Sequence, residues 1–131
     1  MQYLVIDLTA DVPVYIQIMD QIRGLIRDGT LVPGNPLPSV RQLATDLSLN
    51  PNTVARAYNL LEREGTLRTA GRRGTFVSDS APETVHEALQ GRLEQVVDQI
   101  VERTTSLGIE GKDLLEALRT RLKDHKERST S

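Results

Sequence analysis

The chain has 131 residues, of which 38% are hydrophobic and 3% are aromatic. This length suits one small domain with an extension, and the composition requires a mainly aliphatic core. The chain contains no cysteine, which excludes disulfide frameworks and thiolate metal sites. Three tyrosines and one phenylalanine are too few for the stacking platforms of RNA-binding and single-strand-binding modules.

The net charge of −2 at first argues against a nucleic-acid partner, but the charge is unevenly distributed. Residues 37–74 carry six arginines and three acidic residues, which gives +3, whereas residues 81–131 carry eight basic and ten acidic residues, which gives −2. The amino-terminal residues lack the basic and apolar leader of a secreted protein, and no apolar run approaches the ~18 residues that span a bilayer. We therefore expect a cytoplasmic protein, without a membrane partner, whose positive charge lies in its middle segment.

Two elements are expected before residue 39. Residues 3–6 form either a short strand or an ordered arm, and residues 13–28 have the 3- and 4-residue apolar spacing of an amphipathic helix. The predicted apolar stripe of this helix is Tyr15, Ile18, Met19, Ile22, Leu25 and Ile26. Gly29 is expected to end the helix, and the three prolines of residues 32–38 make a rigid connector that cannot continue it.

Two short helices are predicted over residues 39–46 and 50–64, and both have recognisable starting residues. Ser39 stands three residues before a glutamine, which is the capping-box spacing. Asn50 is a strong N-cap residue, and Pro51 suits the first position of a helix. The predicted inward-facing positions are Val40, Leu43, Ala44 and Leu47 in the second helix and Val54, Ala57, Tyr58 and Leu61 in the third.

A hairpin is predicted after Gly65, which ends the third helix. Residues 66–69 and 75–78 are rich in β-branched and aromatic side chains, and glycines bracket a turn that carries two adjacent arginines. Three helices followed by a hairpin are the element order of a winged helix-turn-helix. We therefore predict a mainly α fold with a small β-hairpin, in which residues 1–78 form the winged domain.

The remaining residues, 79–131, are predicted to form two helices with an apolar stripe. Ser80 and Glu83 have the capping-box spacing, glycines at 108 and 111 interrupt the helical pattern, and a polar tail ends it. Two helices alone cannot bury such a stripe, so it covers either the winged domain or another chain. Its Leu, Val and Ile content favours a second copy. The predicted dimerisation residues are Leu89, Leu93, Val96, Val97, Ile100, Leu114, Leu118 and Leu122.

The outer face of the third helix is predicted to read DNA. Asparagine can pair with adenine, arginine with guanine, and an alanine methyl can contact a thymine methyl. The first turn of the helix can hold a phosphate, and the hairpin arginines suit phosphates or the minor groove. The predicted DNA-binding residues are Ser39, Arg41, Asn50, Asn52, Thr53, Arg56, Asn59, Arg72, Arg73 and Gly74. The alternatives are a solvated face without function, a protein-interaction adaptor and a small enzyme, and the segregated positive charge argues against the adaptor.

Four motifs stand in order along the middle of the chain. They are Leu37-Pro-Ser-x-Arg41-x-Leu-Ala44, Asn50-Pro-Asn-Thr-Val54, Leu61-Glu-x-Glu-Gly65 and Gly74-Thr-Phe-Val77. Together they resemble the winged-helix domain of the GntR family of bacterial transcriptional regulators. Pro13-x-Tyr15-x-Gln17 and the brief two-helix carboxy-terminal segment resemble, more narrowly, the YtrA subfamily.

The resemblance implies a homodimeric repressor or regulator that binds a palindromic operator in double-stranded DNA. The DNA-binding positions of the family correspond here to Arg41, Asn52, Thr53, Arg56 and residues 71–74. Pro51 and Ala55 depart from the family pattern, in which many members have arginine at these positions. Base contacts made by those arginines in other members are therefore not expected in this chain.

No cofactor, metal site or catalytic set is predicted. His86 and His125 have no partner at metal-ligand spacing, and no Ser/His/Asp set, phosphate-binding glycine loop or carboxylate pair stands out. The segment after the hairpin is too short for the large effector domains that some GntR-type regulators carry. A small-molecule effector, if one exists, is therefore expected at the dimer interface or between the domains.

Overall fold

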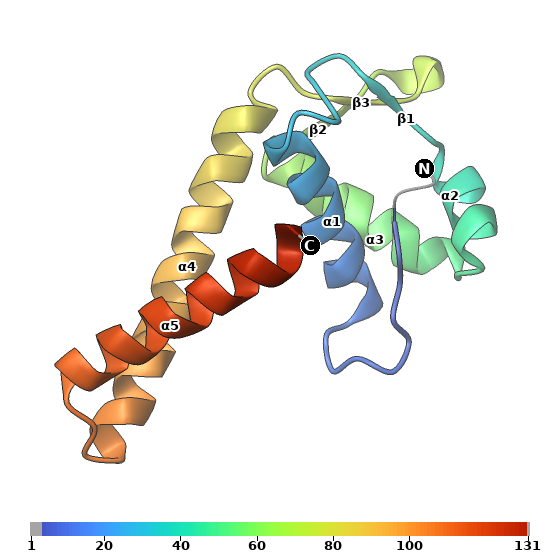
Figure 1. Ribbon diagram of the computed structural model, residues 1–131. Helices are drawn as coiled ribbons and strands as arrows, with labels where there is room; N and C mark the ends of the chain where they lie inside the picture. The colour runs from blue at the N-terminus through green and yellow to red at the C-terminus, as the bar shows by residue number, and fades with distance from the viewer. Residues whose placement is uncertain (1–3, 131) are drawn as a thin grey trace. The chain divides into compact units, whose positions relative to one another are not determined.

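The computed structural model describes residues 4–130, with side chains up to Arg128. Figure 1 shows the helices and the small sheet along the chain. The elements are α1 (Val14–Arg27), β1 (Pro36–Leu37), α2 (Val40–Leu47), α3 (Pro51–Arg63), β2 (Leu67–Thr69), the 3-10 turn η1 (Gly71–Arg73), β3 (Thr75–Val77), α4 (Ala81–Ser106) and α5 (Gly111–Thr130). The predicted mainly α fold with a small hairpin is confirmed.

Two compact units make up the chain, one ending at Leu89 and the other beginning at Gln90. The division falls inside α4 and not after residue 78, where the sequence analysis placed the end of the winged domain. The reason is that the first turns of α4 belong to the winged domain: Ala81 and Val85 are buried in its core, and Leu89 packs against that core.

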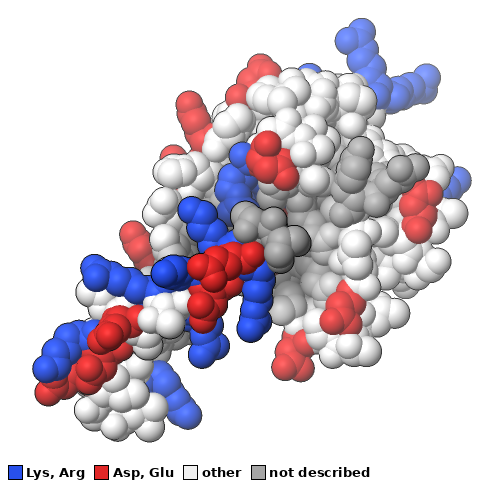
Figure 2. Space-filling view, in the orientation of Figure 1, with Lys and Arg blue, Asp and Glu red and all other residues white. Residues whose placement is uncertain are grey.

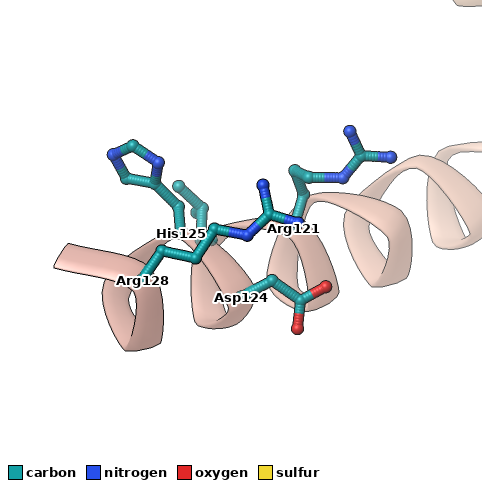
Figure 3. A pocket seen from close by; sticks show the side chains of 5 residues that line it. Arg121, Asp124, His125 and Arg128 are labelled. Atoms are coloured by element: carbon teal, nitrogen blue, oxygen red, sulfur yellow. The ribbon is translucent and has the colours of Figure 1, made fainter. Parts of the chain in front are cut away.

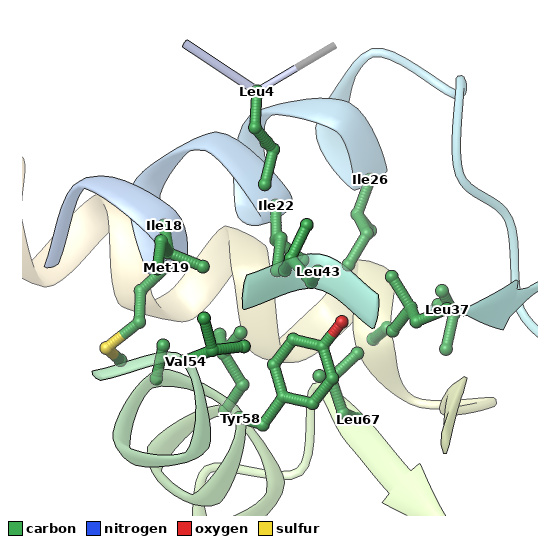
Figure 4. Packing of buried hydrophobic residues seen from close by; sticks show 14 of the residues in the cluster. Leu4, Ile18, Met19, Ile22, Ile26, Leu37, Leu43, Val54, Tyr58 and Leu67 are labelled. Atoms are coloured by element: carbon green, nitrogen blue, oxygen red, sulfur yellow. The ribbon is translucent and has the colours of Figure 1, made fainter. Parts of the chain in front are cut away.

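The core of the first unit forms around α3, which packs against α1 and α2 (Figure 4). The predicted inward positions of α3 are confirmed, because Val54, Ala57 and Leu61 are fully buried and Tyr58 is 5% exposed. In α2, Leu43 and Ala44 are buried, whereas the other two predicted positions are only partly buried. The apolar stripe of α1 is confirmed as well, with Ile18, Met19, Ile22 and Ile26 buried and with Tyr15 and Leu25 partly buried.

The hydroxyl of Tyr58 joins α3 to the connector before α2. It donates a hydrogen bond to the backbone oxygen of Pro38 at 2.8 Å. Burial raises the pKa of Tyr58 well above its usual range, because the charged phenolate is disfavoured away from water. The ring therefore stays a neutral donor at any physiological pH.

The sheet has three antiparallel strands in the order β1-β3-β2. The sequence pattern predicted the hairpin of β2 and β3 and indicated only a rigid connector for the segment of β1. Pro36 pairs with Phe76 and Leu37 with Thr75, so this proline lies on an edge strand, where its missing N–H is tolerated. The added strand ties the connector before α2 to β3, the returning strand of the hairpin.

Residues 4–7 form an ordered arm along α1 and not a strand; Tyr3, where the predicted segment began, lies outside the described residues. Two glutamines of α1 bind the arm through their side-chain amides. Gln21 accepts from the N–H of Val5 at 2.8 Å and donates to its carbonyl at 2.6 Å. Gln17 makes the same pair of bonds with Asp7, both at 2.9 Å. The arm thereby brings Leu4 into the core at 6% exposure.

A polar network fixes the carboxy-terminal end of α3. The guanidinium of Arg23 on α1 donates to both carboxylate oxygens of Glu64, at 3.0 and 2.7 Å. The hydroxyl of Thr66 donates to the same carboxylate at 2.9 Å and lies 3.0 Å from the hydroxyl of Thr84 on α4. This network holds α1, the end of α3 and the beginning of α4 together, so the outer face of α3 has a fixed support.

Candidate nucleic-acid interface

The turn between α2 and α3 is short and closed by local hydrogen bonds. The side chain of Ser39 caps α2 by accepting from the N–H of Gln42 at 3.0 Å, as predicted from the capping-box spacing. Ser48 ends α2 in the left-handed conformation, with a φ of 56°. Asn50 caps α3 by accepting from the N–H of Asn52 at 2.8 Å, with Pro51 at the first helical position. The side-chain oxygens of Ser39 and Asn50 therefore have structural roles at these helix starts.

The outer face of α3 is a shallow groove of polar and basic side chains, which we call the reading face. It is opposite the buried stripe of the same helix, because residues three and four apart share one side. The residues that line it are Asn52, Ala55, Arg56, Asn59, Leu60 and Arg63. The structure thus brings together Asn52, Arg56 and Asn59, which were predicted to bind DNA, and Ala55, the alanine whose methyl group was expected to contact a thymine.

Arg63 belongs to the reading face but was not predicted to be part of it. It is exposed in the last turn of α3, four residues after Asn59 and seven after Arg56. This spacing continues the exposed side of the helix, so the helical period alone could have identified it. Its charge adds to the positive potential at the end of the groove.

Arg56 makes a contact that crosses from α3 to α1. Its guanidinium carbon lies 3.9 Å from the centre of the Tyr15 ring, which is within the range of a cation–π interaction. Arg56 is exposed, whereas Tyr15 is partly buried and packs against the core. The apolar spacing of the helix predicted Tyr15 on the inward stripe and did not indicate this contact.

The first turns of α2 and α3 contribute two further predicted residues. Arg41 is exposed in the first turn of α2, and Thr53 is partly buried in the first turn of α3. The amino-terminal turn of a helix has N–H groups without a helical partner, and these attract anions. The surface near the start of α3 can therefore receive a phosphate.

The hairpin of β2, η1 and β3, residues 67–77, forms the wing. Its tip is the turn Gly71–Arg73, and both arginines of this turn are exposed, as is Gly74. Gly71 and Gly74 have φ values of 55° and 108°, a region that glycine adopts without steric cost. Figure 2 shows basic side chains projecting at the wing tip, while acidic and basic side chains intermix along the carboxy-terminal helices.

Two acidic residues at the end of α3 are engaged in bonds of their own. Glu62 accepts from the hydroxyl of Thr69 at 3.1 Å, and Glu64 is paired with Arg23 on α1. Arg68 on the wing lies over the ring of Phe76, 4.9 Å from its centre. A tight helix-turn-helix, an exposed polar and basic reading face and a basic wing together define a winged helix-turn-helix DNA-binding protein.

Residues 14–77 match the family model described as bacterial regulatory proteins, gntR family. The HTH-type transcriptional repressor YtrA of Bacillus subtilis is 40% identical over 105 residues, which cover 80% of this chain and 81% of YtrA. A GntR family transcriptional regulator from Listeria monocytogenes has a TM-score of 0.74 at 27% identity, covering 86% of this chain and 98% of the other. A transcriptional regulator from Oenococcus oeni has a TM-score of 0.72 at 31% identity, covering 92% and 99%.

The chain belongs to the GntR family of bacterial transcriptional regulators, which bind DNA. The resemblance inferred from the four motifs is confirmed, and the similarity to YtrA agrees with the narrower resemblance. Family membership also confirms the prediction that the protein is a regulator and not an enzyme. Among residues 4–130, no helix combines the length and apolar character that crossing a membrane requires.

The two histidines lie on exposed positions of the carboxy-terminal helices, His86 on α4 and His125 on α5. A surface hollow runs along α5 (Figure 3), where the imidazole of His125 and the carboxylate of Asp124 point to different sides of the helix. Its lining residues are Arg121, Leu122, Asp124, His125 and Arg128. All of them come from one helix, and a hollow with a single wall does not enclose a ligand, so we assign no site to it.

Proposed function

We propose that the protein is a homodimeric repressor that binds a palindromic operator, with one copy of α3 in each of two successive major grooves. The observation that carries this proposal is the reading face, where Asn52, Arg56 and Asn59 stand in one line on an exposed helix that has capped ends and a buried opposite side. Such a helix is rigid enough to hold these side chains against base edges. The protein would act in the cytoplasm, where bacterial DNA lies.

The chemistry of the reading face suits direct base readout. Asn52 and Asn59 can each pair with the N6 and N7 atoms of adenine, and Arg56 can pair with the O6 and N7 atoms of guanine. The methyl group of Ala55 can contact a thymine methyl between them. Arg41, Thr53 and the arginines of the wing would contact phosphates and fix the helix in its groove.

The carboxy-terminal unit supports the dimer. Among residues 90–128 no side chain is fully buried, and large apolar side chains are exposed along both helices and in the turn between them. They are Leu93, Val96, Val97, Val101, Leu107, Ile109, Leu115, Leu118 and Leu122. Exposed apolar side chains in this number mark an interface, and a second copy can cover them symmetrically.

Leu89 is left out of the proposed dimer surface, although the sequence analysis included it. Its side chain is partly buried and packs against the core of the winged domain. The remaining predicted residues, Leu93 to Ile100 on α4 and Leu114 to Leu122 on α5, stay part of the proposal. Ile100 and Leu114 are the two that are partly buried within the single chain.

We propose repression because a similar protein is a repressor, and the geometry of the site does not enter this part of the proposal. YtrA of Bacillus subtilis, which is 40% identical over 80% of this chain, is named a transcriptional repressor. A protein that occupies two major grooves on one face of DNA can block access of the transcription machinery to the same site. A small-molecule effector stays a prediction.

Selection of bound fragments from random double-stranded DNA tests the proposed function. The enriched fragments should contain an inverted repeat whose half-site centres lie about 34 Å, or a multiple of this, apart along one face of B-DNA. Enrichment of a single asymmetric site would contradict the palindrome. No enrichment over the starting pool would contradict sequence-specific binding altogether.

Replacing Arg72 and Arg73 singly with alanine should weaken binding to all DNA sequences to a similar extent. Each change removes a phosphate contact, so the slope of log affinity against log salt should decrease by about 1. Titrations of the selected operator and of a scrambled duplex at several salt concentrations measure this effect. A protein-interaction adaptor would show no salt-dependent DNA binding, and both substitutions would leave its affinity for the partner unchanged.

A further inference from the structure

The contact between Arg56 and Tyr15 restricts the position of one side chain of the reading face. Arg56 lines the groove together with Asn52 and Asn59, but its guanidinium also lies over an aromatic ring of another helix, 3.9 Å from the ring centre. An exposed arginine on a helix normally samples many rotamers and loses this freedom when it binds. The Tyr15 ring restricts the guanidinium before any DNA is present.

The position of the guanidinium over the ring leaves Arg56 able to bind a base. A guanidinium that lies over a ring uses one face of its plane, whereas its N–H groups point outward within that plane. Recognition of guanine uses these in-plane N–H groups, since two of them donate to the O6 and N7 atoms. The aromatic contact and the base contact therefore use different parts of the same group.

Tyr15 is itself held firmly. It lies in the first turn of α1, packs against the core, and is followed two residues later by Gln17, which binds the backbone of Asp7 and Val12. The motif Pro13-x-Tyr15-x-Gln17 thus places two different functions on one helical turn. Gln17 fixes the amino-terminal arm, and the Tyr15 ring supports Arg56.

We infer that Tyr15 is a positioning residue for base readout, which holds the Arg56 guanidinium on the reading face so that its in-plane N–H groups meet a guanine. This inference rests on the proposed function, because it assigns Tyr15 a role in the same DNA site. Tyr15 touches no base in this account and acts only through Arg56. A residue that served the core alone would instead contribute to folding without affecting the choice of base.

The test compares variants on the operator selected from random DNA and on duplexes with single base changes in each half-site. Tyr15→Leu keeps an apolar side chain against the core but removes the ring, and should lower operator affinity about 2- to 5-fold per half-site, the equivalent of ~0.5–1 kcal/mol for an exposed cation–π contact. The loss should coincide with weaker discrimination at the base pair that Arg56→Ala also affects. Tyr15→Phe keeps the ring and should restore both properties.

A double-mutant cycle separates positioning from folding. In the Arg56→Ala background, Tyr15→Leu should have no further effect on operator affinity, because the group it positions is gone. Phe76→Leu is the matched control, since it removes the ring beneath Arg68 on the wing and should leave base preference at that position unchanged. Thermal unfolding of each variant measures any cost to the core independently.

Three results would overturn the inference, and the third is distinguishable from the other two. If Tyr15→Leu lowers affinity equally with and without Arg56, or if Tyr15→Phe fails to restore discrimination, Tyr15 does not act through Arg56 and the proposed function stands. If Arg56→Ala itself leaves operator discrimination unchanged, Arg56 does not read a base, and the assignment of this residue in the proposed function fails as well.

Discussion

Replacing both Leu93 and Val97 with aspartate should convert the protein from a dimer into a monomer at micromolar concentration. The two side chains are 54% and 46% exposed in the single chain and lie one turn apart on the same side of α4. Two carboxylates per copy would bring four negative charges into an apolar seam, where they have no partners and lose hydration. Light scattering of the full chain measures the mass directly.

The same double variant should leave the winged domain intact. Both positions belong to the second unit, and neither is among the residues that form the core of the first unit or pack against it. Operator affinity should nevertheless fall by about 10²- to 10⁴-fold. In the dimer, binding of one copy holds the second reading face near its half-site at a high effective concentration, and the monomer loses this effect. Gln95→Asp, which adds a charge on the opposite side of α4, should keep both the dimer mass and the affinity. A monomer mass for the unmodified chain would refute the dimer.

Replacing Arg56 with alanine should cost about 1–3 kcal/mol of operator binding per half-site and relax specificity at one base pair. The change removes the guanidinium from the middle of the reading face, and alanine has a high helix propensity, so α3 should remain folded. On scrambled DNA the loss should be small, because only one positive charge is removed. Titrations against both duplexes at one salt concentration give the comparison.

Arg27→Ala is the matched control for this substitution. Arg27 is an exposed arginine in the last turn of α1, far along that helix from Tyr15. Its removal takes away the same charge without touching the reading face, so operator specificity should not change. Equal losses for Arg56→Ala on operator and scrambled DNA would remove Arg56 from the set of base-reading residues.

The winged domain was predictable because its signals are local. Asn50 and Pro51 identify the start of α3, and Gly65, with a φ of 87°, takes the left-handed position that ends it. The apolar period then fixes which side of the helix is buried, and the opposite side follows without further information. For this reason the side of α3 that was predicted to be exposed is the side that lies opposite the buried stripe in the structure.

The structural features that the sequence did not predict depend on contacts between segments far apart in the chain. The strand β1 has only two residues, Pro36 and Leu37, and exists because β3 supplies its partner. The Arg56–Tyr15 stack joins two helices whose crossing no local pattern specifies. On α4 the apolar period runs through Leu89 without a break, so the sequence does not reveal where the core ends and the exposed stripe begins.

The spacing of the two half-sites gives the most direct test of the proposed dimer on a palindromic operator. It shows whether two joined copies of α3 bind one face of DNA. The selected operator is compared with a version that carries 5 extra base pairs between its half-sites, about half a turn of B-DNA. We predict that the insertion reduces affinity to that of a single half-site, since one half-site now faces away from its copy of α3. Equal affinity for the two duplexes would contradict the proposed binding of two joined copies to one operator.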